Sequence, residues 1–166
     1  MTKILIVGPS WVGDMMMAQT LFLLLHQHHE NLQLDVLAPS WSLPLLSRMP
    51  EVNQAIVSPF AHGELALRKR YQLAKSLRAK QYDQAIVLPN SLKSALIPFL
   101  AKIPKRTGWL GEKRYGLLND IRHLDKDALP KMVQRFAALA CKRFRTLPVR
   151  SDLPCGTCCG GHSAPG

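Results

Sequence analysis

The chain has 166 residues, 47% of them hydrophobic, which is enough for one globular domain to bury a core without disulfide or metal staples. Its one long apolar stretch, residues 15–25, falls short of the roughly 20 residues that cross a bilayer, which excludes a transmembrane helix. The first apolar run, residues 4–7, is too brief for a signal peptide, so we expect a cytoplasmic protein.

The net charge of +11 is uneven, with −2 in residues 1–60 and +14 in residues 61–150. The second stretch is therefore expected to face something anionic: nucleic acid, a membrane surface or a phosphorylated substrate.

Short apolar runs alternate with longer stretches of helical periodicity along most of the chain. Residues 3–7 are rich in β-branched side chains and end at glycine and proline, which is typical of a buried strand. Asp14 is a good N-cap, and the fifteen residues after it contain no glycine or proline, so a helix should follow. In chain order we predict strand 3–7, helix 15–29, strand 34–38, short helix 42–49, strand 55–57, helix 65–80, strand 85–88, helix 89–101, strand 106–109, a basic loop 111–119 and helix 130–143.

This alternation predicts the fold class. Strands joined by helical crossovers of this length form a parallel sheet with helices on both faces. We therefore expect a doubly wound, Rossmann-like α/β domain over residues 1–143. From Leu147 to Gly166, twelve of twenty residues are Gly, Pro, Ser or Cys, so residues 144–166 are predicted to be a disordered tail. The histidines and the tail cysteines lack the spacing of a structural zinc site, so we expect no metal and no cofactor.

The segment Gly8-Pro-Ser-Trp-Val-Gly-Asp14 lies between the first strand and the first helix, where open α/β sheets bind ligands. It is not a Walker loop, because Asp14 occupies the place of the phosphate-binding lysine, and it lacks the G-x-G-x-x-G spacing of a dinucleotide fingerprint. A carboxylate at a helix amino terminus is stabilised in its ionised form. Asp14 is thus either a simple cap or a general base that deprotonates an acceptor hydroxyl. Ser10 and Gly13 of the same loop are candidate acceptor contacts.

Two further segments could bind an anionic ligand. Asn90, Ser91 and Lys93 surround a helix start after the fourth strand, and suit either sugar hydroxyls and phosphate or plain helix capping. Basic and aromatic residues mix between Arg106 and His123. That mixture can bind nucleic acid, grip phosphorylated sugars, or form a solvated face.

At these same places the sequence resembles the ADP-heptose:lipopolysaccharide heptosyltransferases of glycosyltransferase family 9. The resemblance covers roughly residues 1–140. The segments that carry it are ILIVGPSWVGDMMM at 4–17, DVLAPS at 35–40, PLLSRMPEVN at 44–53, VLPNSLKSA at 87–95 and RTGWLGEKRYGLLND at 106–120.

The resemblance implies a GT-B enzyme with two Rossmann-like domains, the first for the acceptor and the second for the ADP-heptose donor. Asp14 falls on the family's catalytic base. Lys93 and Arg114 fall at positions that line the acceptor site, and Arg68 and Arg70 are weaker matches that would bind acceptor phosphates. The acceptor would be the phosphorylated, heptosylated Kdo-lipid A inner core, met at the cytoplasmic face of the inner membrane.

Because that acceptor carries phosphates and carboxylates, it explains the basic charge of residues 61–150, and no nucleic-acid partner is needed. The alternative is a non-catalytic basic α/β module that binds nucleic acid or an anionic surface. The donor-binding domain implied by the resemblance is absent from these 166 residues. We therefore predict that this chain alone does not transfer heptose.

Overall fold

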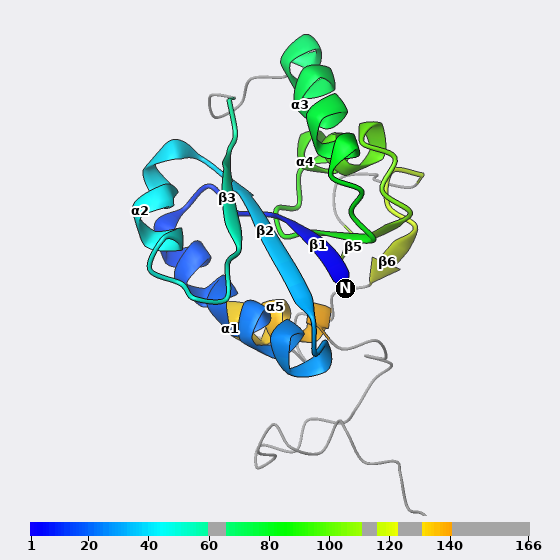
Figure 1. Cartoon of the computed structure of the whole chain (residues 1–166). Coiled ribbons are helices and arrows are strands. Elements are labelled where there is room, and N and C mark those ends of the chain that lie inside the picture. Colours follow the sequence, from blue (N-terminus) through cyan, green and yellow to red (C-terminus); the bar gives the residue numbers. More distant parts are fainter. Residues whose placement is uncertain (60–65, 111–115, 123–130, 141–166) are drawn as a thin grey trace, which may run out of the picture.

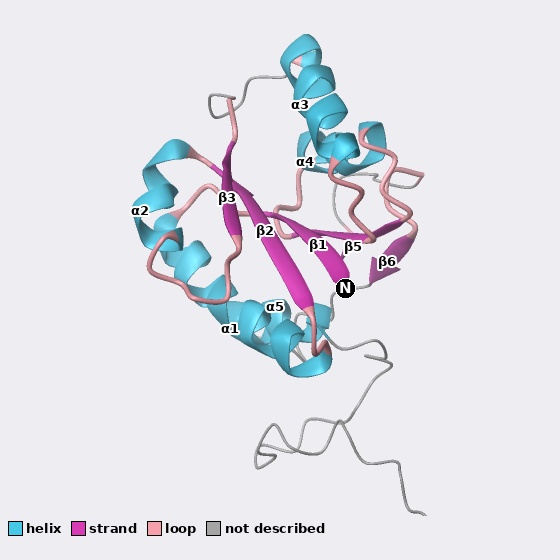
Figure 2. Cartoon of the chain, in the orientation of Figure 1, coloured by secondary structure: helices cyan, strands magenta, loops and turns pink. Residues whose placement is uncertain are grey.

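A computed structural model describes residues 1–59, 66–110, 116–122 and 131–140 (Figures 1 and 2). None of the helices in these ranges combines the length and the apolar content needed to cross a membrane. The elements in chain order are β1 (Thr2–Val7), α1 (Val12–His28), β2 (Leu32–Ala38), η1 (Ser40–Ser42), α2 (Leu43–Leu46), β3 (Gln54–Val57), α3 (Leu67–Ala79), β4 (Gln84–Val87), α4 (Leu92–Leu100), β5 (Lys105–Trp109), β6 (Asp120–Arg122) and α5 (Met132–Ala140).

The six strands of the described chain form one parallel sheet in the order β3-β2-β1-β4-β5-β6. β1 pairs with β2 on one side and with β4 on the other. The connections from β1 and from β4 therefore leave in opposite directions across the sheet. Such a reversal opens a crevice beyond the carboxyl ends of the two strands, where doubly wound sheets bind ligands. The predicted fold class is confirmed.

Each face of the sheet is covered by its own helices, because successive strand residues point to opposite sides. Ile4 and Ile6 pack with α1, α2 and α5, whereas Leu5 and Val7 pack with α3 and α4. Figures 1 and 2 show these two helical layers on either side of the strands. Residues 4–7 of β1 are thus buried on both faces of the sheet, which explains why this part of the strand is continuously apolar rather than alternating.

The first helix begins earlier than the sequence predicted. Trp11 is its N-cap residue, and the first helical hydrogen bond runs from the Met15 amide to the Trp11 carbonyl over 3.0 Å. The prediction that Asp14 is the N-cap is therefore wrong, because Asp14 lies within the first turn. The sequence predicted that Gly13 belongs to the loop, but Gly13 also lies in the first turn. A glycine in the first turn does not interrupt the hydrogen-bond ladder, since the amides there have no helical partner.

The carboxyl-terminal part of the sheet also differs from the expectation. β6 was not predicted, because a strand of three residues is too short to display any alternation. It extends the sheet by pairing with β5. Most of the predicted basic loop, residues 111–115, and the whole predicted tail, residues 144–166, lie outside the described residues.

Candidate functional site

A cleft of about 510 Å³ opens at the carboxyl ends of β1 and β4. Its walls come from the loops that follow β1, β2 and β4, and from the helices α3, α4 and α5. The six predicted site residues that line it are Ser10, Asp14, Arg70, Asn90, Ser91 and Lys93. Residues from distant parts of the sequence thus meet at the crevice that the strand order creates.

Asp14 is the one acidic side chain among the described residues that line the cleft. It is partly exposed, and it forms no hydrogen bond or ion pair with another residue of the described ranges. Its position in the first turn of α1 places the carboxylate near free backbone amides, which favours a negative charge there. A carboxylate that is accessible and not engaged elsewhere can accept a proton from a bound ligand.

The chain segment between β1 and the helix that carries Asp14 is tightly packed at Gly8. The Gly8 amide donates to the Leu37 carbonyl over 2.8 Å. A Cβ atom at this position would lie 2.6 Å from the Met15 Cε atom and 3.1 Å from the Leu37 oxygen. A larger residue would therefore have to displace the end of the Met15 side chain and press on the Leu37 carbonyl, whereas glycine lets the chain lie directly against β2.

On the opposite side of the cleft, Ser91 is the N-cap residue of α4, and its hydroxyl lies 2.6 Å from that of Ser94. Lys93 follows in the first helical turn and lines the cleft with Asn90. Hydroxyl, amide and ammonium groups therefore converge at the amino terminus of a helix, an arrangement that suits sugar hydroxyls or an anionic group.

Arg70 supports this wall from α3. It is only 6% exposed, and its Nη1 donates to the Lys93 carbonyl over 3.0 Å. Arg70 shares the inward face of α3 with Ala74 and Leu77, which follow it at helical spacing. That spacing was a signal in the sequence that Arg70, unlike its neighbours, faces inward.

The charge of the cleft is predominantly positive. Among the described residues, one acidic side chain, Asp14, and three basic side chains line it: Arg70, Lys93 and Arg135. Arg135 comes from α5, which packs on α1, and was not predicted as a site residue. No local pattern pointed to it, because only the packing of α5 brings it to the cleft. Trp41 and Ser58, which follow β2 and β3, were also missed, because only the strand order brings the ends of these strands to the same cleft.

Three predicted site residues are not among those that line the cleft. Gly13 lies in the first turn of α1, and a Cβ there would meet nothing within 4 Å. Arg68 is exposed on α3, two residues from Arg70. Arg114 lies outside the described residues.

The basic and aromatic segment after β5 has a partly structural role. The Arg106 guanidinium donates to the carbonyls of Leu117 and Ile103, over 2.7 and 2.6 Å. Arg122 donates to the Ala138 carbonyl over 2.5 Å. These two arginines therefore tie neighbouring elements together, whereas Trp109 lines the cleft. His123 lies outside the described residues.

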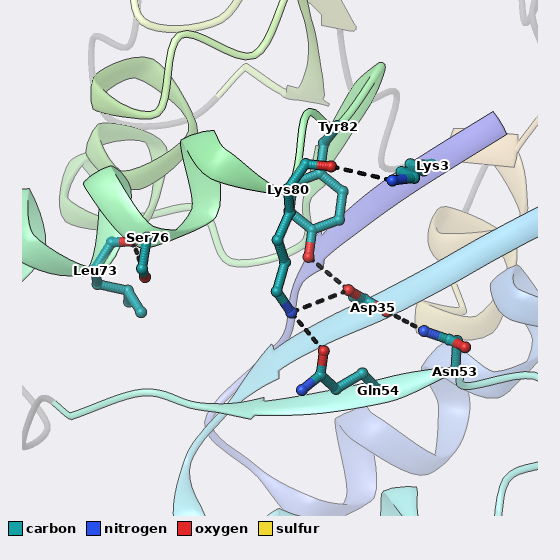
Figure 3. A network of polar contacts seen from close by, with 8 residues as sticks. All are labelled: Lys3, Asp35, Asn53, Gln54, Leu73, Ser76, Lys80 and Tyr82. Atoms are coloured by element: carbon teal, nitrogen blue, oxygen red, sulfur yellow. Dashed lines mark hydrogen bonds and ion pairs between the residues drawn. The ribbon is translucent and has the colours of Figure 1, made fainter.

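A second polar cluster lies between β2, β3 and the end of α3 (Figure 3). Asp35 is 2% exposed and accepts hydrogen bonds from the Tyr82 hydroxyl over 2.6 Å and from the Asn53 amide over 2.9 Å. The Lys80 ammonium lies 3.5 Å from the carboxylate and also donates to Gln54. Burial, together with the hydrogen bond to Asp35, raises the pKa of Tyr82. Since every group of the cluster is paired, its function is structural.

In the described part of the chain, no three His, Cys, Asp or Glu side chains gather into a group that could hold a metal ion. The His26 ring, in the histidine-rich end of α1, is hydrogen-bonded to the Glu51 carbonyl over 2.8 Å.

The sequence family that matches the chain is described as glycosyltransferase family 9 (heptosyltransferase), and the match covers residues 70–154. The chain belongs to this family. The resemblance noted from the sequence is thereby confirmed.

Individual relatives agree with the family. The chain is 62% identical over 138 residues to lipopolysaccharide heptosyltransferase 2 of Escherichia coli strain K12, covering 83% of this chain and 40% of that protein. It is 59% identical over 152 residues to lipopolysaccharide heptosyltransferase 2 of Salmonella typhimurium, covering 92% of this chain and 43% of that protein.

Among solved structures, the E. coli ADP-heptose lps heptosyltransferase II is similar with a TM-score of 0.78 at 57% identity, over 84% of this chain and 40% of that one. This chain therefore spans less than half the length of the relatives that it matches.

Proposed function

We propose that the chain is the acceptor-binding domain of a lipopolysaccharide heptosyltransferase II, with residues 1–143 as that domain. The complete enzyme would transfer heptose from ADP-heptose to the heptosylated Kdo-lipid A inner core. The relatives named above carry the corresponding activity in their names. The donor would be held by a second domain facing the cleft, so these 166 residues would bind the acceptor without transferring heptose.

The observation that carries the proposal is the carboxylate of Asp14 in a cleft whose other described charges are positive. In the proposed reaction the acceptor hydroxyl oxygen attacks the anomeric carbon of the donor. Asp14 takes the hydroxyl proton as the new C–O bond forms. The bond from the anomeric carbon to the phosphate oxygen breaks, and ADP leaves with the bonding electrons. Attack from the side opposite the leaving group inverts the anomeric configuration.

The cationic side chains would bind the anionic groups of the acceptor. Lys93 and Arg70 meet at the first turn of α4, so a phosphate or carboxylate bound there would gain charge-assisted hydrogen bonds. Ser10, Asn90 and Ser91 would take sugar hydroxyls. From the resemblance, Arg114 would add a further cation, and Arg68 and Gly13 remain predicted contacts.

The acceptor is anchored in lipid, so we place the enzyme at the cytoplasmic face of the inner membrane. Exposed basic residues on α3, among them Arg68, Lys75 and Arg78, would attract the anionic headgroups. Each such residue near the surface contributes about 1 kcal/mol, an attraction that salt screens. This contact is peripheral and requires no membrane span.

The direct test is calorimetric titration of the chain with deacylated, phosphorylated inner-core oligosaccharide and, separately, with unrelated DNA duplexes. We expect saturable binding of the oligosaccharide and only weak, salt-sensitive binding of DNA. The reverse result, with DNA bound tightly regardless of sequence and its affinity falling steeply with salt, would establish the basic nucleic-acid module instead.

Activity is tested in a chimaera that joins residues 1–140 to the second half of the E. coli relative. We expect the chimaera to transfer heptose from ADP-heptose to the inner core and the isolated chain to be inactive. A chimaera that folds and binds both substrates without turnover would contradict the proposed role of this domain.

A further inference from the structure

Two tryptophans stand exposed at the cleft that holds Asp14. The exposed fractions are 72% for Trp11 and 55% for Trp41, and both side chains line the cleft. An aromatic ring that is left in water beside polar groups offers a large, rigid contact surface for a ligand. The mechanism proposed above uses neither of them.

The local structure fixes where these rings lie. Trp11 is the N-cap residue of α1, so it directly precedes the turn that carries Asp14. Trp41 lies in η1 after β2, and its Nε1 donates to the Ser10 carbonyl over 3.1 Å. That bond engages the single polar atom of the indole, and it holds the second ring against the peptide that precedes the first.

We propose that Trp11 and Trp41 form a carbohydrate-stacking subsite that receives a sugar ring of the acceptor beside the hydroxyl facing Asp14. This inference rests on the proposed function. A pyranose ring has a face of C–H groups with partial positive charge, and the π face of an indole is negative. The ring edges carry hydroxyls, for which Ser10, Asn90 and Ser91 are the nearby partners in the same cleft.

The charge of the cleft separates this subsite from a phosphate site. Two of the three cations, Arg70 and Lys93, enter from α3 and α4 on one face of the sheet, whereas the tryptophans come from the loops after β1 and β2. Aromatic faces repel anions, so acceptor phosphates would go to the cations and an uncharged ring to the tryptophans. A lipid contact fits less well, because the Trp41 indole donates its polar hydrogen to the protein's own loop.

The test measures affinity by calorimetry for two probes: deacylated, phosphorylated inner-core oligosaccharide, and the same oligosaccharide after removal of its phosphates. We expect Trp41→Ala and Trp11→Ala each to weaken binding of both probes roughly 10-fold, the equivalent of about 1.4 kcal/mol. Trp41→Phe keeps an aromatic face and loses the hydrogen bond, so its affinity should stay within about threefold of the parent.

Tyr71→Ala is the matched control. Tyr71 is 61% exposed on α3 and is not among the described residues that line the cleft, so its removal should leave both affinities unchanged. Circular dichroism and urea unfolding establish that each variant is folded. An unfolded alanine variant is replaced by the leucine variant, which keeps the apolar volume but lacks the π face.

The outcomes separate the two proposals. If the parent chain binds the oligosaccharide and the tryptophan variants bind it equally well, the stacking subsite is overturned and the acceptor role survives. If the parent chain does not bind it, both are overturned. Vesicles of phosphatidylglycerol and phosphatidylethanolamine serve as a third probe. If the variants lose affinity only for these vesicles, the tryptophans contact lipid and the subsite is again overturned.

Discussion

Two aspartates, one in the strand β2 and one in the helix that follows the neighbouring strand β1, have opposite surroundings. Asp35 lies within β2, is buried, and is held by Tyr82, Asn53 and Lys80. Asp14 follows β1, is partly exposed, and has no partner among the described residues. The paired carboxylate can only stabilise the fold, whereas the accessible one can react. The presence or absence of hydrogen-bonding partners therefore distinguishes a carboxylate that stabilises the fold from one that is a candidate general base.

The strongest test of this comparison is Asp14→Asn in the chimaera. Asparagine keeps the size and polarity of the side chain but cannot take a proton, so we expect turnover to fall by roughly 10²–10⁴-fold. Acceptor affinity should change little, and stability should fall by at most about 1 kcal/mol, from the lost interaction with the helix dipole. Rate assays with both substrates saturating measure the effect, and a variant with parental turnover would remove Asp14 from the chemistry.

The converse substitution acts on stability. Asp35→Ala leaves the buried Tyr82 hydroxyl and the Asn53 amide without their acceptor. We expect the free energy of unfolding in urea to drop by roughly 3 kcal/mol. Asp35→Asn retains one oxygen and should cost less. If the alanine variant lowered acceptor affinity while remaining fully folded, the view that this cluster is only structural would be wrong.

Arg70 and Arg68 sharpen the comparison within one helix. Arg70→Ala removes the guanidinium that lines the cleft and holds the Lys93 carbonyl. We expect a loss of roughly 2 kcal/mol in stability, since a hydrogen bond to a charged group contributes about 1.5–3 kcal/mol. Acceptor affinity should fall as well, to a degree that calorimetry measures. The exposed Arg68→Ala is the control for stability, and equal losses of stability at the two positions would contradict the division between them.

Tyr82 makes the stability contributed by the Asp35 cluster depend on pH. Its pKa is raised in the folded protein, so the neutral form is favoured by folding. Above about pH 10 the unfolded chain loses this proton first, and stability falls with rising pH by up to about 1.4 kcal/mol per pH unit. Below that pH the contribution is fully present. Tyr82→Phe should abolish this part of the slope in urea titrations between pH 9 and 11, and identical slopes would show that Tyr82 does not contribute.

Gly13 tests the smallest effect. Its position is helical and open, so Gly13→Ala should raise the free energy of unfolding by about 0.5–1 kcal/mol. If the acceptor approaches the backbone there, as the sequence predicted, affinity should fall in calorimetry despite the gain in stability. Unchanged affinity would show that Gly13 only shapes the turn.

Local patterns were sufficient for most of the elements. The first strand and the strand ending at Val87 were predicted to within one residue of each end, because uninterrupted apolar runs bounded by glycine or proline have few other interpretations. The start of α1 was misplaced by three residues, because Gly13 and Asp14 are equally at home in a loop and in a first helical turn. Boundaries of this kind depend on backbone geometry that composition does not encode.

The sequence by itself determined the alternation of strands and helices, the doubly wound class, and the strand-to-helix junctions near which Asp14 and Lys93 lie. All of these follow from hydrophobic periodicity and turn residues within a few positions of one another. Only the tertiary structure decided that β1 and β4 are neighbours and that Trp41 and Arg135 reach the same cleft. Strand order and helix packing are set by contacts between distant segments, and no local pattern records which segments will meet.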